Sequence, residues 1–201
     1  MTFDFGSFLK KNFLAIIICF FAFTGFIAAT TLTIEKFEVL RNPNAELACN
    51  INTVFNCGTV MKSPYAEVFG IPWSLLGVAG YPAAILTGLI YIDRRKTNRI
   101  LTYLVTLPPL GAFVLSSYFM WITAYQIGAF CPWCILSAIS SVNIFFALLA
   151  LQIEENNLGL PEKIAQAIQA KLKQGWGVYF ILALYSIFVM MEWYPFYIAG
   201  R

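Results

Sequence analysis

Residues 100–153 read ILTYLVTLPPLGAFVLSSYFMWITAYQIGAFCPWCILSAISSVNIFFALLALQI and contain no charged side chain. A helix needs about 20 apolar residues to cross a bilayer, so this run is too long for one membrane span. Gly128 interrupts it within the stretch TAYQIGAF, which is a suitable place for a short turn. The sequence therefore predicts two spans here, at about residues 100–122 and 130–151.

Other uncharged runs extend the same pattern along the chain. Residues 13–34 and 68–92 predict the first two spans, and an apolar segment from Val178 predicts a fifth. Of the 201 residues, 60% are hydrophobic and only 11% are charged, whereas soluble domains have about 25% charged residues. We expect an all-α integral membrane protein, with a four-helix transmembrane bundle and a fifth transmembrane helix. A cleaved signal peptide is the alternative for the first span, but its apolar run exceeds the usual length of about 7–15 residues.

The distribution of Lys and Arg predicts how the chain is oriented. Nine of the 13 lie at the N-terminus, at residues 93–99 and in the 154–175 connection, and the other side holds four. The positive-inside rule then places the N-terminus in the cytoplasm and the loop 35–67 outside it, in a plasma (inner) membrane protein. The stretch LGLPEKIAQAIQAKLKQG (158–175) reads as an amphipathic helix on the membrane surface or as a plain connector helix.

Four of the five cysteines form two pairs that the predicted topology brings to one side of the membrane. Cys49 and Cys57 lie in the loop 35–67, whereas Cys131 and Cys134 begin the fourth span, two crossings later. That side is the extracytoplasmic one, where disulfides form and persist. Cys19 lies within the first span, and we assign it no role beyond packing.

The motif CPWC suits redox chemistry even though the chain contains no histidine to act as a base. Pro132 favours a helix start, so Cys131 lies at a helix N-terminus and Cys134 lies one turn deeper. Helix N-termini stabilise thiolates, and the thiolate is the attacking species in disulfide exchange. We expect Cys131 to face the loop and Cys134 to face the apolar region.

The ordered set CNINTVFNC, SPYAEVFGIPWSLLG and FCPWC resembles the vitamin K epoxide reductase family, in particular the bacterial and archaeal homologues coupled to disulfide formation. The resemblance covers about residues 10–151 and implies a four-helix bundle around a quinone of the ubiquinone or menaquinone type. The resemblance assigns residues 1–151 to the catalytic bundle, and the apolar and amphipathic patterns beyond it divide the rest into a connector at 152–175 and the fifth helix at 176–201. It also implies a separate thioredoxin-like (DsbA-like) partner, whose dithiol the protein oxidises.

The resemblance also implies residue roles. Cys49 would meet the partner, Cys57 would exchange with Cys131, and Cys134 would pass electrons to the quinone. Ser63 matches the supporting Ser or Thr of the family, and Phe69 and Trp73 match apolar positions of the quinone pocket. The Asn and Tyr that bind the quinone or epoxide in the animal enzymes are replaced by Ala66 and Ala138, which favours quinone reduction over vitamin K epoxide reduction.

Three other functions are compatible with parts of the sequence. A DsbB-type oxidase has similar chemistry, but its cysteine pairs occur in the opposite order. A metal-binding membrane protein with a four-cysteine site and no redox turnover is the main alternative, since four thiolates can hold zinc tetrahedrally. A scaffold or transporter subunit is less favoured, because the first four predicted spans contain no charged residue. The net charge of +3 does not suggest a nucleic-acid partner.

Overall fold

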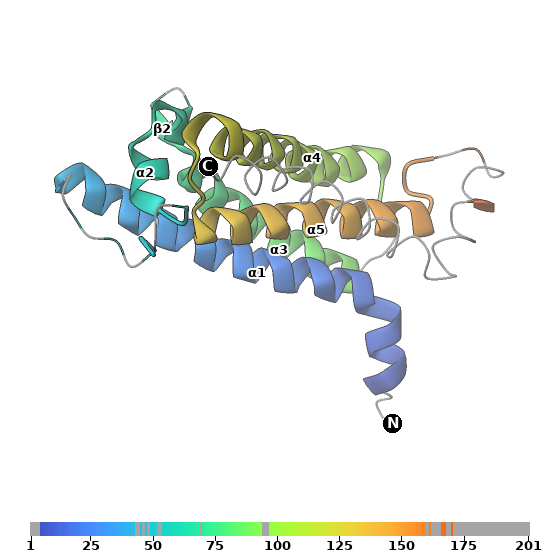
Figure 1. The fold of residues 1–201 in the computed structure, drawn as a ribbon. Helices are drawn as coiled ribbons and strands as arrows, with labels where there is room; N and C mark the ends of the chain where they lie inside the picture. Colours follow the sequence, from blue (N-terminus) through green and yellow to red (C-terminus); the bar gives the residue numbers. More distant parts are fainter. Residues whose placement is uncertain are drawn as a thin grey trace.

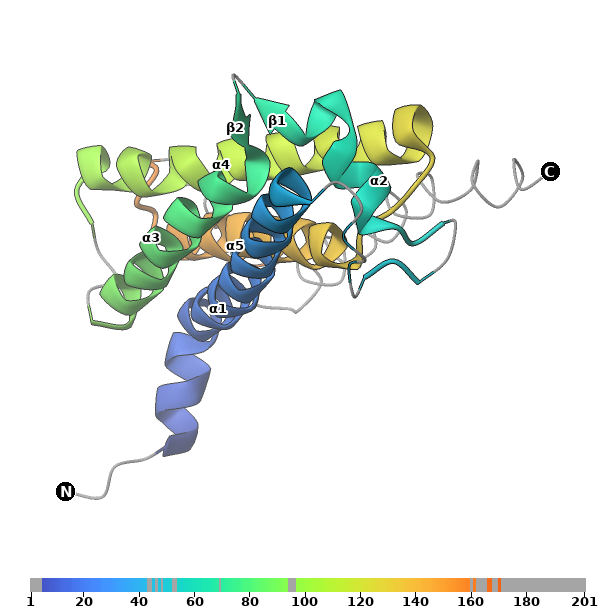
Figure 2. The same ribbon diagram turned by 90° about the vertical axis from the view of Figure 1, so that its left-hand side faces the viewer.

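A computed structural model of the chain describes residues 5–42, 45, 47, 49–51, 54–68, 70–93, 97–159, 161, 166, 167 and 170. In this part of the chain, four long helices form a bundle (Figures 1 and 2). They are α1 (Phe5–Arg41), α3 (Trp73–Asp93), α4 (Arg99–Ile122) and α5 (Pro132–Glu154). Each is long and apolar enough to cross a membrane, which confirms the predicted four-helix bundle. The predicted fifth helix and half of the predicted connector lie outside the described residues.

The helices pack in the order α3, α1, α5, α4, so that α1 contacts both α3 and α5. Small residues let α1 and α3 approach closely, as is common between membrane helices. A Cβ atom added at Gly88 of α3 would lie 2.5 Å from Cys19 Sγ of α1, and one added at Gly77 would lie 2.8 Å from Ala29. Cys19 therefore packs at this helix interface, with its thiol directed toward the carbonyl oxygen of Ile85.

Short elements gather at one end of the bundle, beside the end of α1 and the start of α5 (Figure 1). They are α2 (Cys57–Lys62), the 3-10 turn η1 (Pro64–Ala66) and a hairpin of β1 (Glu67–Val68) and β2 (Ile71–Pro72). Gly70, in the turn of this hairpin, has φ of 76°, a conformation that glycine adopts without strain. These elements form a cap over that end of the bundle.

Several helix boundaries differ from the sequence predictions. Helix α1 continues to Arg41, past Ile34 where the sequence predicts the end of the first span. Helix α3 begins at Trp73, because the β-hairpin occupies the first residues of the predicted second span. A π-helical turn, η2 (Thr123–Ile127), extends α4, and it ends at Gly128 with φ of 69°, where the sequence places the turn.

Candidate functional site

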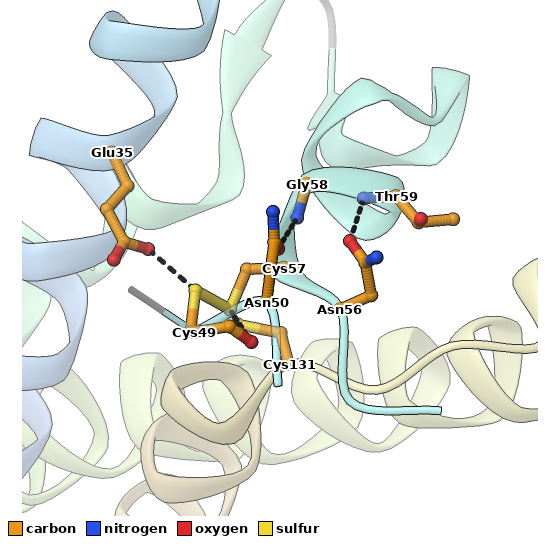
Figure 3. The surroundings of a disulfide bond; sticks show 8 residues. All are labelled: Glu35, Cys49, Asn50, Asn56, Cys57, Gly58, Thr59 and Cys131. Carbon is orange, nitrogen blue, oxygen red and sulfur yellow. Dashed lines mark hydrogen bonds between the residues drawn. A yellow bond between two sulfur atoms is a disulfide. The ribbon is translucent and has the colours of Figure 1, made fainter. Parts of the chain in front are cut away.

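A disulfide joins Cys49 and Cys57, whose Cα atoms are 5.7 Å apart (Figure 3). The backbone around it is paired: Asn50 and Asn56 form an antiparallel bridge, and the Ile51 N–H donates to the Phe55 carbonyl at 2.9 Å. Side chains add to this pairing, because the Gly58 N–H donates to Asn50 Oδ1 at 3.0 Å. The Cys49–Cys57 segment is thus fixed by local hydrogen bonds as well as by the covalent bond.

Asn56 starts the helix that carries Cys57. It is the N-cap of α2, and its Oδ1 accepts from the Thr59 N–H at 2.9 Å, a contact that satisfies one of the free donors at a helix start. Gly58 follows Cys57, and a Cβ atom there would lie 3.3 Å from the side chains of both Asn50 and Asn56. The small residue at position 58 therefore lets the two asparagines close around the helix start.

Main-chain hydrogen bonds hold this segment against the residue that precedes Cys131. The Phe130 N–H donates to the Val54 carbonyl at 2.7 Å, and the Asn56 N–H donates to the Phe130 carbonyl at 2.9 Å. We call this pair of bonds the Phe130 clamp. As a result, Cys57 Sγ lies 3.1 Å from Cys131 Sγ, although the two residues are far apart in the sequence.

Cys131 is the N-cap of α5, as the position of Pro132 predicts. A hydrogen bond from the Cys134 thiol lowers the pKa of Cys131 below its ordinary value. The backbone N–H groups of Cys134 and Trp133 at the helix start lower this pKa further, whereas burial opposes the change, as does the carboxyl group of Glu35 when it is ionised. Cys131 is therefore placed to react as a thiolate, in the absence of any histidine.

The cysteine sulfur atoms are arranged in space in an order that suits thiol–disulfide exchange. Cys49 and Cys57 are oxidised, whereas Cys131 and Cys134 are free thiols, and a thiolate attacks a disulfide sulfur that it can approach directly. Cys49, Cys57 and Cys131 are 5%, 0% and 1% exposed, so the exchange site is closed to bulk water. While the disulfide is intact, Cys49 and Cys57 offer no thiolate to a four-cysteine metal site.

Two charged residues of α1 reach the cysteine segment, and the sequence did not identify either of them. Glu35 Oε2 lies 3.2 Å from Cys49 Sγ. Lys36 Nζ donates to the Met61 carbonyl at 2.7 Å and forms an ion pair with Glu67 at 2.9 Å, so α1 is tied to the end of α2 and to β1. Leu32, Glu35, Lys36 and Val39 are buried at helical spacing, and this pattern could have indicated that the helix continues.

A cavity of about 370 Å³ lies between α3 and α4, which hardly contact each other. Its walls are mainly apolar, and Cys134 lines it from α5. Three of its lining leucines, Leu76, Leu104 and Leu115, are also among the exposed side chains, so the cavity opens on the lateral surface of the bundle. Pockets for small organic molecules are commonly about 300–1,000 Å³ and mostly apolar.

A small polar group interrupts the apolar wall on the α5 side. The Tyr81 hydroxyl donates to the Ser137 carbonyl at 2.8 Å and lies 2.7 Å and 3.0 Å from the hydroxyls of Ser137 and Ser141. Cys134, Ser137 and Ser141 share one face of α5, because they are three and four residues apart. These hydroxyls can orient a polar group of a bound molecule beside Cys134.

The remaining sequence-predicted site residues lie around this cavity and the cap. Trp73 lines the cavity, packs on Phe119 with 5.9 Å between the ring centres, and donates from Nε1 to the Tyr65 carbonyl at 2.8 Å. Ser63 lies in the cap, where its Oγ donates to the Val60 carbonyl at 2.8 Å. Ala138 lines the cavity and Ala66 is buried in η1, whereas Phe69 lies outside the described residues.

Comparison with known proteins agrees with this arrangement. The vitamin K epoxide reductase family matches residues 16–150, a range that contains all four paired cysteines and the cavity. The chain belongs to this family. The chain is also 32% identical over 98 residues to the thiol-disulfide oxidoreductase LTO1 of Arabidopsis thaliana, an alignment covering 45% of the chain and 25% of that relative. The chain thus matches only about a quarter of the length of this curated relative.

Family membership and the four apolar helices indicate a multi-pass membrane protein. Together with the relative and the Cys49–Cys57 disulfide, they support an oxidoreductase that acts on thiols and disulfides.

Proposed function

We propose that this protein is a membrane thiol oxidase and quinone reductase that generates disulfides for protein folding. The observation that carries the proposal is the continuity of the site. Cys57 lies 3.1 Å from Cys131, and Cys134, one helical turn beyond Cys131, lines the apolar cavity. A disulfide at the cap is thereby connected, through a second cysteine pair, to a site for an apolar molecule.

The cysteines exchange electrons in a fixed order. A thiolate of the partner attacks Cys49, the Cys49–Cys57 bond breaks, and Cys57 leaves as a thiolate. The second thiol of the partner then displaces Cys49, which completes the partner's disulfide and leaves a reduced cysteine pair. Cys57 passes the electrons on by attacking Cys131 when the latter is disulfide-bonded to Cys134, so that a Cys57–Cys131 mixed disulfide forms and Cys134 is released facing the cavity. Cys49 then attacks Cys57, which re-forms the Cys49–Cys57 bond and releases Cys131 as a thiolate.

The cavity suits a quinone of the ubiquinone or menaquinone type as the oxidising substrate. Bound there, a quinone accepts two electrons and two protons and so restores the oxidised cysteines. The opening beside Leu76, Leu104 and Leu115 would let a long apolar tail extend into the lipid, and Ser137, Ser141 and Tyr81 would hold a ring oxygen. Ala138 leaves no hydrogen-bonding group at its position in the wall, which supports quinone rather than epoxide reduction.

The partner in this proposal is a separate thioredoxin-like, DsbA-like protein that meets Cys49 at the capped end of the bundle. The excess of Lys and Arg at the other end favours a cytoplasmic N-terminus and an extracytoplasmic cap in the plasma membrane. In this arrangement residues 1–151 form the catalytic bundle, and residues 152–175 and 176–201 act as connector and fifth helix.

The test compares Cys134→Ala with Cys19→Ala, a cysteine variant at the α1–α3 interface. Purified protein in detergent is given a reduced thioredoxin-like protein and a soluble quinone, and quinone consumption is followed by absorbance. We expect Cys134→Ala to abolish quinone reduction while mass spectrometry still detects the Cys49–Cys57 disulfide, and Cys19→Ala to retain turnover. Undiminished quinone turnover in Cys134→Ala would sink the proposal.

A further inference from the structure

Glu35 is a buried acidic residue in contact with a reactive sulfur. It is 9% exposed, and its Oε2 lies 3.2 Å from Cys49 Sγ (Figure 3). The mechanism described above gives Glu35 no role. In the proposed function, Cys49 is the sulfur that the partner thiol attacks. A carboxyl group in contact with this sulfur is a candidate for general acid–base catalysis, because such a group must lie within hydrogen-bond distance of the atom whose proton it transfers.

The redox state of Cys49 determines which atom in this contact carries the proton. Neither sulfur of a disulfide bears a hydrogen, so a hydrogen bond between Cys49 and Glu35 in the oxidised protein requires a protonated carboxyl group. In the reduced protein the Cys49 thiol can donate to the Glu35 carboxylate instead. In this contact the proton is therefore on the Glu35 oxygen when Cys49 is oxidised and on the Cys49 sulfur when Cys49 is reduced.

Other ionisable groups around Glu35 do not replace it in this role. Lys36 is directed to the Met61 carbonyl and to Glu67. Glu38, one turn further along α1, is exposed and acts on Glu35 through its charge. Cys57 and Cys131 lie on the other side of Cys49, and Glu35 interacts electrostatically with Cys131 and Cys134. Among these residues, Glu35 is the one whose carboxyl group contacts Cys49.

We propose that Glu35 is the proton donor and acceptor of Cys49, holding the proton while Cys49 is in the disulfide and giving it to Cys49 when the disulfide is reduced. This inference rests on the proposed thiol–disulfide function. In the reduction, the Cys49–Cys57 bond breaks, an S–S bond forms in the incoming dithiol, and two electrons pass to the protein. The dithiol loses two protons, Cys57 gains one from solvent, Cys49 gains the proton of Glu35, and the carboxylate remains.

The net reaction therefore releases one proton for each disulfide reduced by a dithiol. In a Glu35→Gln variant both new thiol protons come from outside the site, and no net proton is released. The equilibrium constant with a dithiol should consequently rise about tenfold per pH unit near neutral pH in the protein with Glu35, and should stay constant in Glu35→Gln. A side chain that merely supports the fold would not change this dependence.

The experiment uses the full chain in detergent with Cys19→Ala, Cys131→Ser and Cys134→Ser, so that only the Cys49–Cys57 pair reports. The protein is equilibrated from both the oxidised and the reduced side with mixtures of reduced and oxidised dithiothreitol at several pH values between about 6 and 8, below the usual thiol pKa. Free thiols are then trapped with N-ethylmaleimide and counted by mass spectrometry. Asp93→Asn, which removes an exposed acid at the end of α3, is the matched control.

We expect a tenfold change in the equilibrium constant per pH unit with Glu35 and with Asp93→Asn, and no change with Glu35→Gln. The inference is overturned if the protein with Glu35 shows no pH dependence, or if Glu35→Gln keeps the tenfold change. Neither quinone nor protein partner takes part, so failure here is distinct from failure of the quinone-reduction test. Conversely, a Cys134→Ala variant that still reduced quinone would leave this result unaffected.

Discussion

Removing the Cys134 thiol should make Cys131 a weaker nucleophile at neutral pH. The hydrogen bond from Cys134 is the largest cause of the lowered pKa of Cys131, and Cys131 is almost fully buried, so solvent does not screen the bond. A hydrogen bond to a charged group contributes about 1.5–3 kcal/mol, which corresponds to a factor of about 10–150 in the thiolate-to-thiol ratio. The loss raises the pKa, so a higher pH is needed to form the thiolate.

The assay compares Cys134→Ala with Cys134→Ser, which keeps a hydroxyl donor at the same position. The reduced variants react with iodoacetamide, and alkylation of Cys131 is followed by peptide mass spectrometry over a range of pH. At pH 7 the Ala variant should react about tenfold or more slowly than the Ser variant, and the two rates should converge at high pH, where Cys131 is ionised in both. Equal rates at pH 7 would refute the reasoning that Cys134 activates Cys131, and convergence at high pH shows that access is equal.

Three further changes test the packing and the cavity. Gly88→Ala should cost about 1–3 kcal/mol of stability, because its Cβ would lie 2.5 Å from Cys19 Sγ, and adding Cys19→Ala should recover part of this loss in thermal unfolding in detergent. Asn56→Ala should cost about 1 kcal/mol through loss of the α2 cap, measured in the same way, whereas Asn56→Asp should retain most of the stability. Tyr81→Phe should raise the KM for quinone about two- to tenfold and leave alkylation of Cys131 unchanged; an unaltered KM would remove Tyr81 from the quinone site.

The sequence was sufficient to predict the membrane bundle and the grouping of the cysteines. Uncharged runs near the length of a bilayer span have few alternatives, and two crossings bring Cys57 and Cys131 to the same end of the bundle. The position of Cys131 at a helix start followed from Pro132. These features depend on length, charge and local backbone preference, which a single sequence displays directly.

The contacts that give the site its chemistry depend on tertiary structure. The sequence places Glu35 in a loop because a charged residue usually marks the end of an apolar span, but α1 continues because Lys36 finds the Met61 carbonyl and Glu67. The Phe130 clamp joins segments distant in the sequence through main-chain atoms. Because these bonds do not depend on particular side chains, the sequence gives no signal for them. From the sequence, Tyr81 is one aromatic residue within an apolar span. Its polar role becomes visible only in the structure, where Ser137 and Ser141 lie beside its hydroxyl.

The Phe130 clamp also affects what happens once the disulfide opens. Its two hydrogen bonds involve the carbonyl of Val54, the N–H of Asn56 and the main chain of Phe130, and none of them requires the Cys49–Cys57 bond. Cys57 can therefore stay tethered beside Cys131 after reduction, so that the next exchange proceeds at the high effective concentration of an intramolecular reaction. The two donors are the main-chain N–H groups of Asn56 and Phe130, so a proline at either position would remove one bond of this tether, whereas position 54 needs to supply only its carbonyl.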